Sequence, residues 1–205
     1  MKNTVQFMAA VLVCTLCSSC GTSATSTSSG ADQNSSASLP APPPSWTVVA
    51  TTDKMSGAKQ WFAESPAASP EDPMRFPYSD VQAYLNVGCD KHSEWTYFTF
   101  STSPNLTHTR THNGYSSVPT RIKWGSKITD VTLTQNWGSR FLSFDPGEGA
   151  VDRIPRHKTV LLELRWYGQG RVYFPFSLLG AKEAIQRIRG HCGMGPKVVK
   201  TAKGK

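Results

Sequence analysis

Residues 159–180 read TVLLELRW, YGQG and RVYFPFSLLG, and they predict a β-hairpin near the end of the chain. Apolar residues alternate along both arms, which puts eight of them on one face: Val160, Leu162, Leu164, Trp166, Val172, Phe174, Phe176 and Leu178. The glycines of the connection permit a tight turn. Pro175 has no N–H to donate, so the second arm is expected at a sheet edge or at a bulge.

Similar strand signals occur upstream of this hairpin. Apolar or aromatic runs bounded by turn residues predict strands at 46–50, 81–89, 95–100, 121–124, 128–133 and 141–144. Residues 89–93 favour a hairpin connection between two of these strands. The polar segment 101–120, STSPNLTHTRTHNGYSSVPT, is predicted to be the longest loop of the domain.

One amphipathic helix is predicted, in AKEAIQRIRGHC at residues 181–192. Its apolar face consists of residues at helical spacing: Ala181, Ala184, Ile185, Ile188 and Cys192. Strands followed by one terminal helix predict a mainly β domain over residues 46–192. We expect an antiparallel sandwich or a strongly bent sheet with the C-terminal helix packed against it.

The N-terminus has the features of an exported bacterial protein. Lys2 supplies the positive charge and residues 5–16 the short apolar run of a signal peptide, predicted at 1–19. Ser18 and Ser19 precede Cys20 as small residues precede the lipid-bearing cysteine of a lipobox. Lipidation of Cys20 is therefore predicted, with ordinary cleavage after Ala24 as the alternative. An iron–sulfur or zinc site in the C-x2-C-x2-C run is disfavoured, because the run lies in a leader without a fourth ligand.

Residues 20–45 are rich in Ser, Thr and Pro and contain one large apolar residue, Leu39, which predicts a tether rather than a folded segment. A lipid anchor followed by a tether predicts attachment to a membrane of the bacterial cell envelope. By resemblance to the sorting rules of Gram-negative lipoproteins, Gly21 rather than Asp after the cysteine favours the outer membrane, with the domain facing the periplasm or the cell surface.

Two cysteines follow the leader, Cys89 and Cys192. In an exported protein an isolated pair is most simply a disulfide, and one closing so long a loop would contribute about 4–5 kcal/mol by loop entropy. The alternative is a nucleophilic Cys89 with His92 as its base.

The net charge of +8 invites a nucleic-acid interpretation, but half of it comes from four lysines in the last thirteen residues. Residues 193–205 are therefore predicted to be a basic flexible tail. No stripe of Lys and Arg interleaved with aromatic residues occurs, so nucleic acid is not an expected partner.

Catalytic and metal-binding signals are weak. His108 and His112 have ligand-like spacing, but the Pro, Asn and Gly residues around them indicate a loop, and no metal or other cofactor is expected. Asp145 and Glu148 lie in a Pro- and Gly-containing turn, and no G-x-S-x-G motif occurs. The protein is therefore expected not to be an enzyme, with an envelope hydrolase as a remaining alternative.

Binding is the expected activity. Tyr115 and Arg110 in the 101–120 segment and Tyr167 at the 167–170 turn are predicted to be exposed and form the candidate binding surface. The expected partner is another envelope protein or a cell-wall polymer.

Four features resemble small secreted two-cysteine accessory proteins of type VI secretion loci and related bacterial lipoproteins of unknown function: the leading Trp46, L-x-x-x-C at 85–89, R-x-x-W at 121–124, and the closing motif at 176–192. The resemblance implies a β-rich fold, bridged cysteines and no known catalytic residues. The tether, the 101–120 segment and the basic tail depart from that pattern. A secretion accessory and a prophage-type exclusion or inhibitor lipoprotein therefore remain alternative functions.

Overall fold

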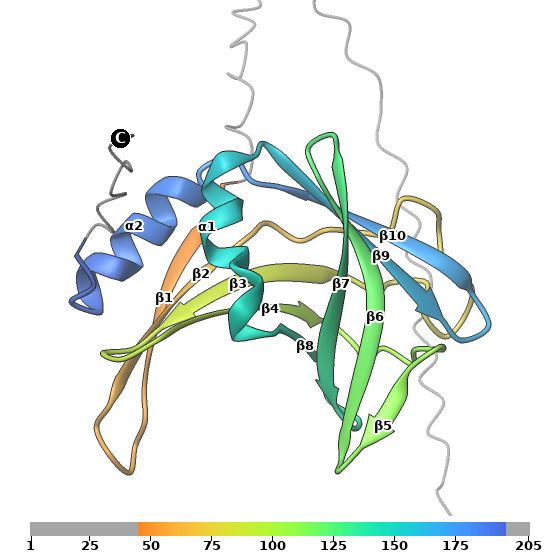
Figure 1. Ribbon diagram of the computed structural model, residues 1–205, viewed down its shortest axis with the longest axis horizontal. Helices are drawn as coiled ribbons and strands as arrows, with labels where there is room; N and C mark the ends of the chain where they lie inside the picture. Colours follow the sequence, from red (N-terminus) through yellow and green to blue (C-terminus); the bar gives the residue numbers. More distant parts are fainter. Residues whose placement is uncertain (1–44, 196–205) are drawn as a thin grey trace, which may run out of the picture. The chain divides into compact units, whose positions relative to one another are not determined.

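The computed structural model describes residues 45–195 (Figure 1). The predicted signal peptide at 1–19, the lipidation site at Cys20, the tether up to residue 44 and residues 196–205 of the basic tail lie outside the described residues.

The domain is mainly antiparallel β, as predicted, with a terminal helix. Its strands are β1 (Thr47–Thr52), β2 (Lys59–Glu64), β3 (Ala83–Cys89), β4 (Glu94–Phe100), β5 (Arg110–His112), β6 (Tyr115–Trp124), β7 (Lys127–Asn136), β8 (Phe141–Phe144), β9 (Thr159–Trp166) and β10 (Gly170–Ser177). Its helical segments are η1 (Pro146–Glu148), α1 (Ala150–Arg153), η2 (Ile154–Arg156) and α2 (Ala181–His191).

All ten strands belong to one sheet, in the order β1-β2-β3-β4-β8-β7-β6-β9-β10, with β5 beside β6. The sheet is strongly bent, with β1 and β2 on one side of β3 and β4 and with β6 and β7 on the other (Figure 1). The bend brings β10 over β4, where Phe98 lies 5.3 Å from Phe176 and Phe100 lies 5.5 Å from Phe174, ring centroid to ring centroid. One face of the sheet therefore folds around the core, and the opposite face remains toward solvent.

The β9–β10 hairpin forms in the register that the alternation predicts, from Thr159 opposite Ser177 to Trp166 opposite Gly170. All eight apolar residues of the predicted face are buried. The strand with Pro175 is the last of the sheet, as expected. Neighbouring segments cover part of its edge: the Trp46 indole donates to the Ser177 carbonyl at 3.0 Å, and the Glu71 amide donates to the Tyr173 carbonyl at 2.9 Å.

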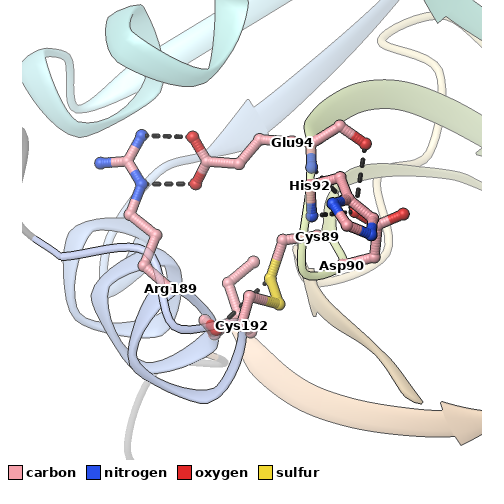
Figure 2. Close-up of a disulfide and its surroundings, with 8 residues drawn as sticks. Cys89, Asp90, His92, Glu94, Arg189 and Cys192 are labelled. Atoms are coloured by element: carbon pink, nitrogen blue, oxygen red, sulfur yellow. Dashed lines mark hydrogen bonds and ion pairs between the residues drawn. A yellow bond between two sulfur atoms is a disulfide. The ribbon is translucent and has the colours of Figure 1, made fainter. Parts of the chain in front are cut away.

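Helix α2 lies over the β1–β3 end of the sheet (Figure 1), and the predicted apolar residues of its face are buried. The Cys89–Cys192 disulfide ties the end of this helix to β3, with 6.2 Å between the two Cα atoms (Figure 2). Beside it, Arg189 donates two hydrogen bonds to the Glu94 carboxylate, one of them 3.0 Å from Nη2 to Oε2. One disulfide and two hydrogen bonds therefore hold α2 against the core face of the sheet.

Three parts of the domain differ from the sequence prediction. Strand β2, which pairs with β1 and β3, was not predicted. The 101–120 segment is not one loop, because residues 110–112 pair with residues 115–117 as the β5–β6 hairpin around Asn113 and Gly114. Both turn residues have positive φ, 48° and 82°, the conformation that an Asn-Gly turn adopts readily. The predicted single helix was also incomplete, because η1, α1 and η2 form short helical turns between β8 and β9.

Candidate binding surface

The solvent-facing side of the sheet, called here the outer face, has a continuous row of polar residues. Cross-strand pairing aligns seven of them from β2 to β5: Glu64, Asn86, Tyr97, Ser143, Thr134, Ser117 and Arg110. Directly paired residues share a face of the sheet, so this row is a consequence of strand register. It runs across seven strands and connects segments far apart in the sequence.

A groove of about 400 Å³ lies along the middle of this row. Four aromatic and four small polar residues line it, and we call it the aromatic groove: Trp95, Tyr97, Tyr115, Phe141, Thr134, Asn136, Ser139 and Ser143. The Tyr97 and Phe141 rings meet edge to face, with centroids 5.7 Å apart. Phe141 is 47% exposed and Tyr115 is 53% exposed, so both rings present apolar area to solvent.

Gly88 determines where Trp95 lies. Gly88 is the cross-strand partner of Trp95, and a Cβ atom at Gly88 would be 2.5 Å from Cε2 and from Nε1 of the indole. The indole therefore occupies the volume that a side chain would fill on β3. Phe62 from β2 contacts the same indole edge to face at 6.1 Å between centroids. Packing on two neighbouring strands holds Trp95 at one end of the groove.

Tyr97 and Glu64 are half-buried polar residues of the outer face. Burial, followed by the negative charge of Glu64, raises the pKa of Tyr97 to about 12. Burial also raises the pKa of Glu64. No hydrogen bond or ion pair to the Glu64 carboxylate is found among residues 45–195. A desolvated carboxylate without a compensating cation is unfavourable for folding, which is typical of a group kept for contact with a ligand.

A second, larger hollow of about 570 Å³ lies on the same face over β6, β7, β9 and β10. Its ionic lining residues, called here the charged patch, are Arg121, Asp130, Glu148, Glu163, Arg165 and Arg171. Burial alone would raise the pKa of Glu163, but hydrogen bonds from Arg121 and Tyr173 and the charge of Arg171 hold it below its usual range. Arg121 and Arg171 pair with Glu163 there, so the centre of the patch has a structural explanation that the aromatic groove lacks.

The residues of the predicted binding surface lie in two places. Tyr115 lines the aromatic groove, and Arg110 ends the polar row beside it. Tyr167 is 65% exposed at the β9–β10 turn, outside the groove, where its amide donates to the Asn105 carbonyl at 2.8 Å. The turn is therefore joined to the first half of the 101–120 segment.

Sequence reasoning missed the other residues of the groove. Trp95 and Tyr97 alternate with buried Phe98 along β4, so this strand has large aromatic residues on both faces. Aromatic residues at the solvent-facing positions of a half-buried strand were the available signal. Phe141 on β8 carried the same signal, but the pairing of β8 with β4 could not be read from the sequence.

The residues considered as a nucleophile or as catalytic carboxylates have structural roles in the domain. Cys89 is in the disulfide, which leaves no thiol for His92 to activate (Figure 2). Asp90 accepts hydrogen bonds from the amides of His92 and Ser93, and these bonds lower its pKa. Asp145 accepts from the Gly147 amide at the start of η1, as expected for a turn. Within residues 45–195, no group of three or more His, Cys, Asp or Glu side chains could hold a metal ion.

Comparisons with known proteins give no relative: no protein-family model, no curated protein and no solved structure matches this chain. None of the helices within residues 45–195 has the length and apolar character needed to cross a bilayer.

Proposed function

We propose that this chain is a non-catalytic binding protein held at the bacterial cell envelope, and that the aromatic groove is its contact surface. The partner is an envelope protein or a cell-wall polymer. The observation that carries the proposal is the groove itself: two exposed rings, Phe141 and Tyr115, lie beside small hydrogen-bonding side chains in the middle of the sheet. Exposure of apolar ring area to water is unfavourable, and a bound partner would bury that area.

The location rests on the sequence. The apolar leader, Cys20 and the Ser/Thr/Pro-rich segment after it predict a lipid anchor and a tether, at the outer membrane and facing the periplasm or the cell surface. The absence of catalysis rests on two features of the described domain. Cys89 is tied to Cys192, and the acidic turn at Asp145 caps a short helix.

In-cell photocrosslinking tests the contact surface. A photoreactive phenylalanine derivative replaces Asn136 in the groove, and in the matched control it replaces Gln186, an exposed residue of α2. We expect adducts with one envelope component from position 136 only. Equal adducts from both positions, or none from position 136, would contradict the proposal.

The intact mass of the protein from native membranes tests the anchor. A mass that begins at Cys20 and includes a diacylglyceryl group and an acyl chain is expected. A lipid-free mass that begins beyond Cys20 would show a diffusible protein and would overturn the anchor.

A further inference from the structure

We infer that the ligand of the aromatic groove is a neutral glycan chain, with sugar rings stacked on Tyr97, Phe141 and Tyr115. This inference rests on the proposed function, because it names the ligand class of the same surface. Three observations support it: the chemistry of the lining residues, the spacing of the polar row, and the pairing of the strands beneath the groove, which leaves no free sheet edge for a peptide.

The lining matches a sugar in its chemistry. Its aromatic rings offer faces with negative partial charge, which attract the C–H groups on the face of a sugar ring. The hydroxyl groups of Thr134, Ser139 and Ser143 and the amide of Asn136 can exchange hydrogen bonds with sugar hydroxyls. None of the eight lining residues is charged, which suits a neutral ligand.

The polar row is long enough to contact several sugar rings of a glycan chain. From Tyr97 on β4 to Arg110 on β5 the row crosses four inter-strand steps, each about 4.8 Å along the sheet, and Asn86, which is 2% exposed, separates this part from Glu64. One such step is close to the length of one ring in an extended glycan, so several successive rings could meet successive strands. Glu64, beyond the groove, would accept hydrogen bonds from hydroxyls, which suits its lack of a cation partner within residues 45–195.

Two other ligand classes fit this face less well. An extended peptide is usually recognised by backbone pairing at a sheet edge, whereas the groove lies in the middle of the sheet, where β4, β8, β7 and β6 already pair with one another. An anionic polymer would need cations inside the groove, whose lining has none, and two arginines of the neighbouring hollow, Arg121 and Arg171, are engaged with Glu163.

Titration of the full-length protein with neutral oligosaccharides tests the inference. The probes are a β-1,4-linked N-acetylglucosamine tetramer and a β-1,4-linked glucose tetramer, and tryptophan fluorescence and calorimetry report binding. We expect at least one tetramer to bind, with affinity falling at least ten-fold in Phe141→Ala and in Tyr115→Ala. Phe141→Tyr, which keeps the ring, should stay within about two-fold of wild type.

The matched control is Ile128→Ala. Ile128 is 57% exposed on β7, similar to Phe141 and Tyr115, but it lies outside the groove lining, so its removal should leave affinity unchanged. All three side chains are about half exposed, so the variants should fold, and a denaturant midpoint for each variant verifies it.

Failure of the inference is distinguishable from failure of the proposed function. If neither tetramer binds, or if Phe141→Ala binds them as well as wild type, the glycan inference is wrong. If position 136 nevertheless crosslinks to an envelope protein, the proposed function stands without it. Sugar binding that disappears in Phe141→Ala supports the inference whatever the crosslinking gives.

Discussion

Because Gly88 has no side chain, the indole of Trp95 can pack over it on the outer face. Gly88→Ala would put a methyl group 2.5 Å from the ring, so the indole must move or β3 must shift. We expect a loss of about 1–3 kcal/mol in the free energy of unfolding, as for other overpacked sites. Urea denaturation followed by tryptophan fluorescence measures both the loss and the displaced indole.

Gly190→Ala is the matched control for this substitution. Gly190 lies in α2 with ordinary helical backbone, and a methyl group added there would meet no neighbouring atom within 4 Å. The same change there should stabilise the protein by about 0.4–1 kcal/mol, because it reduces the freedom of the unfolded chain. Equal effects at the two positions would refute the steric explanation for Trp95.

Glu64 gives the outer face a testable pH dependence. Burial raises its pKa, so the folded state holds the proton more tightly than the unfolded state does. Its contribution to stability is therefore largest at low pH and is lost as the pH rises through the raised pKa. Glu64→Gln should be more stable than wild type at pH 7 and equal to it below about pH 4. Denaturant midpoints across this range would contradict the account if the two proteins stayed equal throughout.

Tyr97 should produce a late step in an alkaline titration. Its pKa is raised to about 12, above the value of about 10 for a solvated phenol, so its neutral form stabilises the folded state. That stabilisation is complete below pH 10 and is lost as the pH rises from about 10 to 12. Phenolate absorbance should lose this step in Tyr97→Phe. In Glu64→Gln the step should move to lower pH, because the negative charge of Glu64 contributes to the shift.

At the scale of elements, α2 depends on Arg189. The side chains of Arg189 and Glu94 are 16% and 7% exposed, and Asp152 of α1 accepts a third hydrogen bond from the same guanidinium at 3.3 Å. Arg189→Met removes the guanidinium that donates two hydrogen bonds to the Glu94 carboxylate in the domain interior. We expect a loss of about 3–5 kcal/mol, as for other broken buried pairs. Arg187→Met, at an exposed position of the same helix, should change stability by less than about 0.5 kcal/mol.

Some elements could be predicted from the sequence and others could not. The β9–β10 hairpin and α2 were predictable, because each buries one face with a regular period. The β5–β6 hairpin was missed because residues 110–112 are exposed and polar, so they carry no periodic signal. The Asn113-Gly114 pair was the local clue, since an Asn-Gly turn favours a hairpin whatever the burial of its arms.

The aromatic groove was unpredictable as a site for a different reason. Its residues come from β4, β6, β7, β8 and the turn between β7 and β8, and β8 inserts between β4 and β7 although it follows both in the chain. Sequence patterns give the face of a residue within one strand, but they do not give the order of strands in a bent sheet. Tyr115 was predicted to be exposed, yet its neighbours Tyr97 and Phe141 could be found only from the register.

At the scale of the whole molecule, the disulfide joins two parts of the domain that are 103 residues apart in sequence. In the loop-entropy account, closing a loop of this length stabilises the folded state by about 4–5 kcal/mol. Cys89→Ala combined with Cys192→Ala should therefore lower the urea midpoint strongly while the β-sheet spectrum is retained. A reducing agent should lower the midpoint of the wild type to the same extent and leave that of the double variant unchanged.

The central claim is that the aromatic groove, and not another part of the surface, meets a partner in the envelope. Hydroxyl-radical footprinting tests it directly, by comparing side-chain oxidation of the purified full-length protein with that of the same protein in native envelopes. We predict protection of Phe141 and Tyr115 in the envelope, while Tyr167 and Met55, which are 65% and 96% exposed, react equally in both samples. Protection of Tyr167 with full reactivity of Phe141 and Tyr115 would contradict the account.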